Sequence, residues 1–128
     1  MWLDFVQGKE GLERIFGNKP YGSIVELRRI SFEDCTTIIE FDLQEWPENP
    51  PAKWLAQKFN TIQVKLAIGG CAEINFKDWA QANIGVFRIK ELNSGVLLSF
   101  KFVSNSGAYF SCVCDALLIS SISSYTNV

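Results

Sequence analysis

The feature that most constrains the fold of this chain is an alternation of apolar and polar residues that recurs after residue 23. It is clearest at "TIQVKLAI" (61–68), where every second residue is aliphatic. A period of two is typical of a β-strand with one buried face. We predict further strands at 23–32, 36–46, 71–76, 85–92, 96–102 and about 108–119. Two "NSG" segments, at 93–95 and at 105–107, mark tight hairpin turns between the later strands.

Two local departures from this alternation refine the prediction. Residues 9–16, "KEGLERIF", place Leu12, Ile15 and Phe16 on one helical face before Gly17. In the first strand the apolar parity changes at Arg28–Arg29, as a β-bulge would require. The expected fold is therefore α+β but mostly β, as a single domain over residues 1–128. One short N-terminal helix precedes six or seven antiparallel strands in a curled or half-closed sheet.

Composition narrows the possible chemistry. The chain has no histidine, which removes the commonest general base and metal ligand. Its four cysteines follow no zinc or redox spacing, and no glycine-rich phosphate loop is present. We therefore expect no catalytic residues, no metal and no cofactor. A formal net charge of −2 argues against a nucleic-acid partner. The sequence shows no membrane-spanning run and no signal peptide, so we expect a cytoplasmic protein, with a monomer favoured.

The most unusual segment is "FEDCTTIIEFDLQEWPENPP" (32–51), which contains no lysine or arginine. It carries six carboxylates: Glu33, Asp34, Glu40, Asp42, Glu45 and Glu48. The alternation places Ile39, Phe41 and Leu43 inward and Glu40 and Asp42 outward. One interpretation is a solvated face neutralised by neighbours such as Lys65 or Lys101. The other is a surface for a basic protein partner, formed by the six carboxylates with Trp46 as an anchor.

Two further classes of function stay open at this point. The 13% aromatic content could line the cavity of a small-ligand-binding β-barrel. Paired carboxylates such as Glu40 and Asp42 could also run hydrolysis without histidine, although that needs a cleft between them. Trp54 and Trp79, in or beside loops, could each be a core-capping ring or a surface anchor.

The N-terminal segment "MWLDFVQGKEGLERIFGNKP" resembles the opening of the immunity protein 50 family of bacterial polymorphic-toxin systems. The shared pattern comprises Trp2, Gly8, Glu10-x-Leu12, "IFG" and Pro20. The proline-rich break, the "INF…N-I" loop at 74–84 and the last strand "YFSCVCDALLISSI" are similar in layout. Where members of the family often carry "P-x-F-H-D" after the helix, this chain has "PYGSIVEL" and so lacks the His and Asp.

This resemblance implies a cytoplasmic protein that binds the cognate toxin domain and neutralises it by occlusion, without catalysis. Many such toxins are nucleases, which hold phosphates in basic clefts. On this hypothesis the carboxylate-rich segment would face a basic toxin.

Overall fold

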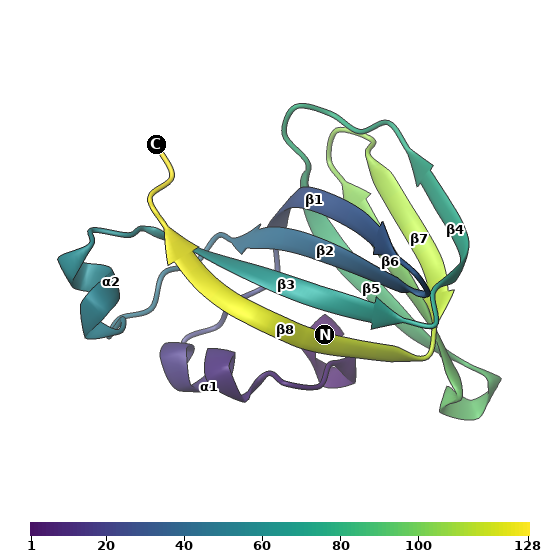
Figure 1. The fold of residues 1–128 in the computed structure, drawn as a ribbon, viewed down its shortest axis with the longest axis horizontal. Coiled ribbons are helices and arrows are strands. Elements are labelled where there is room, and N and C mark those ends of the chain that lie inside the picture. Colours follow the sequence, from purple (N-terminus) through teal and green to yellow (C-terminus); the bar gives the residue numbers. More distant parts are fainter.

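The computed structural model describes residues 1–128 as one sheet of eight antiparallel strands (Figure 1). The strands are β1 (Val25–Glu33), β2 (Thr36–Leu43), β3 (Thr61–Gly69), β4 (Ala72–Lys77), β5 (Ile84–Leu92), β6 (Leu97–Ser104), β7 (Tyr109–Cys114) and β8 (Ala116–Tyr125). They are ordered β4-β7-β6-β5-β1-β2-β3-β8, so β4 and β8 are the edges of an open sheet. The prediction of a mostly β, half-closed antiparallel sheet is confirmed.

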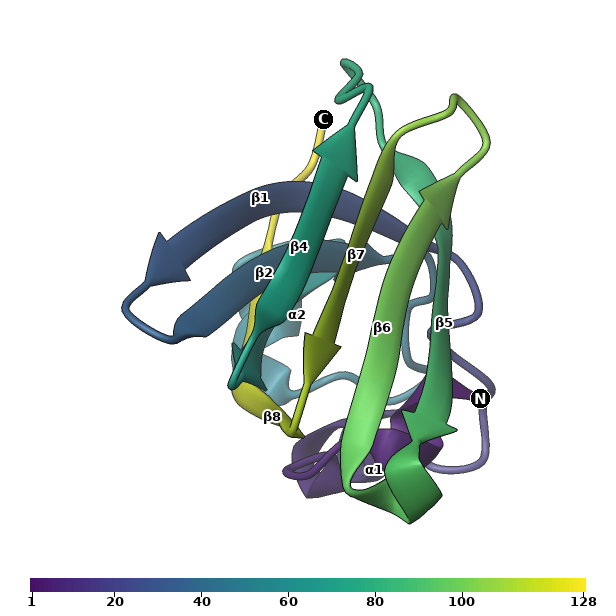
Figure 2. The same ribbon diagram turned by 90° about the vertical axis from the view of Figure 1, so that its right-hand side faces the viewer.

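The sheet folds into two layers at the junction of β1 and β5. These two strands pair only at Val25–Gly85 and Glu26–Ile84, whereas β1 and β2 pair along nearly their whole length. Figure 2 shows the β4-β7-β6-β5 layer upright, with β1 and β2 crossing behind it. The predicted bulge is present between Leu27 and Arg29. Because β1 leaves β5 after two pairs, its remaining length borders no strand on that side.

The core lies between the two layers and is rich in aromatic rings. Ile39, Phe41 and Leu43 are buried, as the alternation predicts. The Phe87 ring lies 5.3 Å from Trp2, 4.9 Å from Phe41 and 5.2 Å from Phe100, measured between centroids. These rings pack on one another and fill the space that a ligand-binding barrel would need to leave open.

Two 3₁₀ turns and two short helices complete the fold: η1 (Trp2–Phe5), α1 (Glu10–Phe16), α2 (Ala52–Ala56) and η2 (Asn93–Gly95). The expected N-terminal helix is α1, which buries Leu12 and Phe16 and ends at Gly17. Trp54 on α2 is also buried, so this ring belongs to the core. No helix in the chain has both the length and the apolar character that a membrane crossing requires.

The strand count exceeds the predicted six or seven because the strand expected at about 108–119 is two strands. The chain turns at Asp115, whose N–H donates to the Gly69 carbonyl at 3.0 Å. On one side β7 pairs with β6 and β4, and on the other β8 pairs with β3. The buried parity also changes there, from Cys112 and Cys114 to Leu117. This change of phase marks the break.

Candidate functional site

The seven residues predicted to bind a partner occupy three places along the β1–β2 hairpin and the segment after it. Glu33 and Asp34 lie at the turn between the strands, and Glu40 and Asp42 lie in β2. The remaining three, Glu45, Trp46 and Glu48, follow the end of β2. The structure therefore separates them into a middle pair and two ends.

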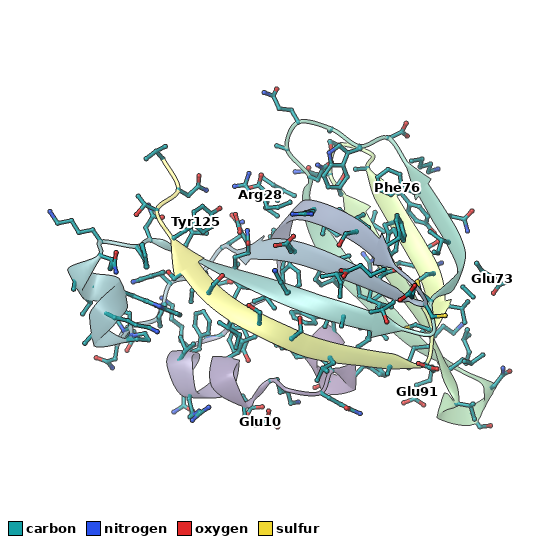
Figure 3. All side chains as sticks on the ribbon, viewed as in Figure 1. Glu10, Arg28, Glu73, Phe76, Glu91 and Tyr125 are labelled. Atoms are coloured by element: carbon teal, nitrogen blue, oxygen red, sulfur yellow. The ribbon has the colours of Figure 1, made fainter.

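Asp42 does not face solvent, contrary to the prediction: its side chain is 2% exposed. Its carboxylate accepts hydrogen bonds from Arg28 Nε at 2.8 Å, from Gln63 Nε2 at 3.1 Å and from the Tyr125 hydroxyl. Figure 3 shows Arg28 and Tyr125 above the β1–β2–β3 surface. The alternation assigned the correct face of β2, but side chains from β1, β3 and β8 cover that face at this point.

The charges of this cluster shift the ionisation of its donors. Burial by itself would lower the pKa of Arg28, but the hydrogen bond and charge of Asp42 and the charge of Glu26 together raise it. Burial, followed by the hydrogen bond to Asp42, raises the pKa of Tyr125 to about 12. Both donors are protonated at neutral pH, and both shifts act in the direction that favours this protonated form.

Glu40 is also largely covered, with 15% of its side chain exposed. Its carboxylate oxygens lie 3.5 Å from Arg29 Nε and 3.8 Å from Lys65 Nζ. Lys65 is thus one of the neutralising neighbours that the sequence suggested. Lys101, the other candidate, lies on β6 opposite Arg88.

The exposed members of these ion pairs are the cations. The side chains of Arg29, Lys65 and Arg28 are 71%, 48% and 35% exposed. Those of their partners Glu26, Glu40 and Asp42 are 17%, 15% and 2% exposed. The middle of the outer face therefore presents positive charge to solvent, although β2 alone is acidic.

The two ends keep exposed carboxylates. Glu33 and Asp34 are exposed at the hairpin turn, where the Cys71 N–H donates to the Cys35 carbonyl at 3.3 Å. At the other end Glu48 is exposed, while Glu45 is half-buried and accepts a hydrogen bond from the Gly22 N–H at 3.1 Å. Glu33, Asp34 and Glu48 therefore remain exposed carboxylates, at two separate ends of the segment.

Trp46, the predicted anchor, is half-buried and packs on the core. Its ring lies 5.9 Å from that of Trp54, and its carbonyl accepts a hydrogen bond from Lys19 Nζ at 2.6 Å. Trp79, in contrast, is 44% exposed and stacks on Phe76, itself 49% exposed, with centroids 5.8 Å apart.

These two rings line a shallow, open surface groove with Arg28, Arg29 and Ile30, a grouping that the sequence alone does not indicate. The sequence offers one signal, the segment "INFKDW" (74–79). Its apolar residues do not follow an alternation that would assign all of them to a buried face. Their meeting with β1 depends on how the two layers of the sheet cross.

Comparison with known proteins places the chain in a family. The family model described as Immunity protein 50 matches residues 8–125 of this sequence. No curated protein and no solved structure matches it.

Proposed function

Because the chain belongs to the Immunity protein 50 family, we propose that it binds the toxin domain of its cognate system and neutralises it by occlusion. The observation that carries this proposal is the family match, which extends over residues 8–125 and so includes every strand of the sheet. The chain contributes a rigid surface and catalyses no reaction. The toxin and this protein would meet in the cytoplasm.

We further propose that the toxin is basic, as expected of a nuclease that holds phosphates. The exposed carboxylates Glu33 and Asp34 at the hairpin turn, and Glu48 at the other end, support this proposal. Exposed charges steer association more than they strengthen the final complex. Glu40 and Asp42 act indirectly in this arrangement, because they hold the arginines of the outer face in place.

The experiment that tests the proposed function is a pull-down with the toxin domain encoded immediately upstream, followed by a toxicity assay with and without this protein. We expect stable binding and loss of toxic activity. Failure to bind that domain, with the chain folded by circular dichroism, would contradict the proposal.

A further inference from the structure

The groove between β1 and β4 exists because neither strand is paired on the side facing it. β4 is an edge of the sheet, and β1 has left β5 after Glu26. Leu27 still donates to the Asn83 carbonyl at 2.9 Å, but the strand beyond it has neighbours only on the β2 side. The space, about 440 Å³, is lined by Arg28, Arg29 and Ile30 from one layer and by Phe76 and Trp79 from the other. Figure 3 shows Phe76 between the layers.

The groove combines an aromatic wall with cationic groups. Phe76 and Trp79 form a stacked pair that leaves nearly half of each side chain exposed. Tryptophan and arginine are among the side chains most enriched at the positions that dominate binding energy in protein interfaces. Ile24 and Val103 are also exposed and line a second surface pocket, but that pocket contains no aromatic ring. The groove is therefore a place where a partner's aromatic or aliphatic side chain can pack on exposed aromatic rings.

The charge of the groove selects the partner's polar group. Arg29 is 71% exposed and Arg28 35% exposed, and no carboxylate lines the groove. A guanidinium group presents a planar fork of donors that matches a carboxylate. Arg28 is already held by Asp42 through Nε and by Glu26 through Nη2. Arg29, whose only ion-pair partner is Glu40 at 3.5 Å, is therefore the guanidinium that a partner can reach. The chain's net charge of −2 and the exposed Glu33 and Asp34 further along β1 disfavour a long polyanion such as a nucleic acid.

We propose that this groove receives a segment of the toxin domain in which a carboxylate side chain lies next to an aliphatic or aromatic one. The carboxylate binds the exposed guanidinium group of Arg29, and the apolar side chain packs on Phe76 and Trp79. This assignment rests on the proposed function and adds a second contact to it. Glu33 and Asp34 at the end of β1 meet basic groups, and the groove holds an acidic and apolar segment of the same partner.

The test compares the affinities of variants for the toxin domain encoded immediately upstream, in a catalytically inactive form, by titration calorimetry. Trp79→Ala and Arg29→Glu should each weaken binding at least tenfold. Arg29→Lys should lose part of the affinity, because it keeps the charge without the fork. The matched controls are Leu55→Ala, an exposed apolar truncation on α2, and Arg88→Glu, the same charge reversal on β5. Both controls should bind within twofold of the wild type.

Two additional measurements keep the test decisive. Thermal melting followed by circular dichroism should show that each groove variant is as well folded as its matched control. Acrylamide quenching of tryptophan fluorescence should fall when the wild type binds toxin and should fall less in Trp79→Phe.

The outcomes separate the two proposals. If the wild type binds and both groove variants bind equally well, the groove assignment is wrong and the proposed function stands. If the wild type does not bind, both are overturned. If a 20-nucleotide single-stranded DNA binds the wild type and Arg29→Glu abolishes that binding, the groove takes a polyanion and the assignment is also wrong.

Discussion

Asp42 shows how a single carboxylate can organise the outer face of a sheet. Burying a charge is costly unless opposite charge and hydrogen bonds compensate. Here an arginine, an amide and a hydroxyl, from three different strands, surround the carboxylate. Tyr125 is the last residue of β8, so the same contact connects the end of this edge strand to β2 in the middle of the sheet.

Replacing Asp42 by asparagine should therefore destabilise the fold. The substitution keeps the shape but removes the charge that compensates Arg28, so we expect a loss of about 1–3 kcal/mol in the free energy of unfolding. Urea denaturation measures this loss. Asp34→Asn, an exposed position with φ of 53° that asparagine tolerates, is the matched control and should change little. Equal midpoints for the two variants would show that Asp42 has no structural role.

The Tyr125 hydroxyl makes the stability of the fold depend on pH in the alkaline range. Its pKa is raised from 10.0 to about 12, so the folded protein holds this proton more tightly than the unfolded chain does. The stabilisation is fully present below the unfolded value and is lost as the pH rises from about 10 through 12. Urea midpoints at pH 9 and 11 should fall further in the wild type than in Tyr125→Phe. Tyr21, whose pKa burial also raises, is present in both proteins, so the difference reports Tyr125. Parallel declines would refute this coupling.

At the scale of the element, β1 determines both the shape of the sheet and the groove. Its first residues pair with β5, and the bulge between Leu27 and Arg29 then changes which residues face the core. Beyond the bulge, the strand carries Arg29 and Ile30 along the open side of the groove. One strand thus joins the two layers and then separates from one of them.

Beside this junction, the close approach of β5 to β6 depends on Gly85. A Cβ at this position would lie 2.6 Å from Ser104 Cα on the adjacent strand, which is backbone and cannot move aside. Gly85→Ala should lower the free energy of unfolding by about 3 kcal/mol, the upper part of the range for overpacking. Gly69→Ala is the control, since its Cβ would lie 3.3 Å from the Asp115 side chain, which can adjust. A thermal melt that ranks the two variants equally would disprove a steric role for Gly85 in the approach of β5 to β6.

At the scale of the whole molecule, the charge that each region presents to solvent depends on which charged side chains are exposed, and not on the overall composition. The chain is close to neutral, with 12 basic and 14 acidic residues. Buried carboxylates under exposed guanidinium groups make the middle of one face positive, and the exposed carboxylates Glu33 and Asp34 make its edge negative. Such a surface can contact partner groups of both signs.

This arrangement predicts how association with the toxin responds to salt. If the hairpin turn steers a basic toxin, the association rate should fall roughly tenfold between about 50 and 500 mM salt. Glu33→Lys should slow association at low salt and flatten this dependence. Glu91→Lys makes the same charge change on β5, next to η2 and away from the β1–β2 turn in Figure 2, and should leave the rate near that of the wild type. Stopped-flow measurement of the rates tests this prediction, and a rate independent of salt would exclude steering.

The sequence by itself determined the local features. Side-chain alternation predicted the strands and the buried face of β2, and a change of parity located the bulge near Arg28–Arg29. The spacing of Leu12 and Phe16 predicted α1. These features depend on residues a few positions apart, whose geometry the backbone period fixes.

Only the tertiary structure decided the surface. Whether Asp42 faces water depends on Arg28, Gln63 and Tyr125, which are up to 83 residues away. The groove likewise joins Ile30 to Trp79 across two layers. A pattern along the chain specifies which face of a strand a residue occupies, whereas strand order and layer crossing specify what covers that face. For this reason the carboxylates of an acidic strand lie beneath a cationic surface.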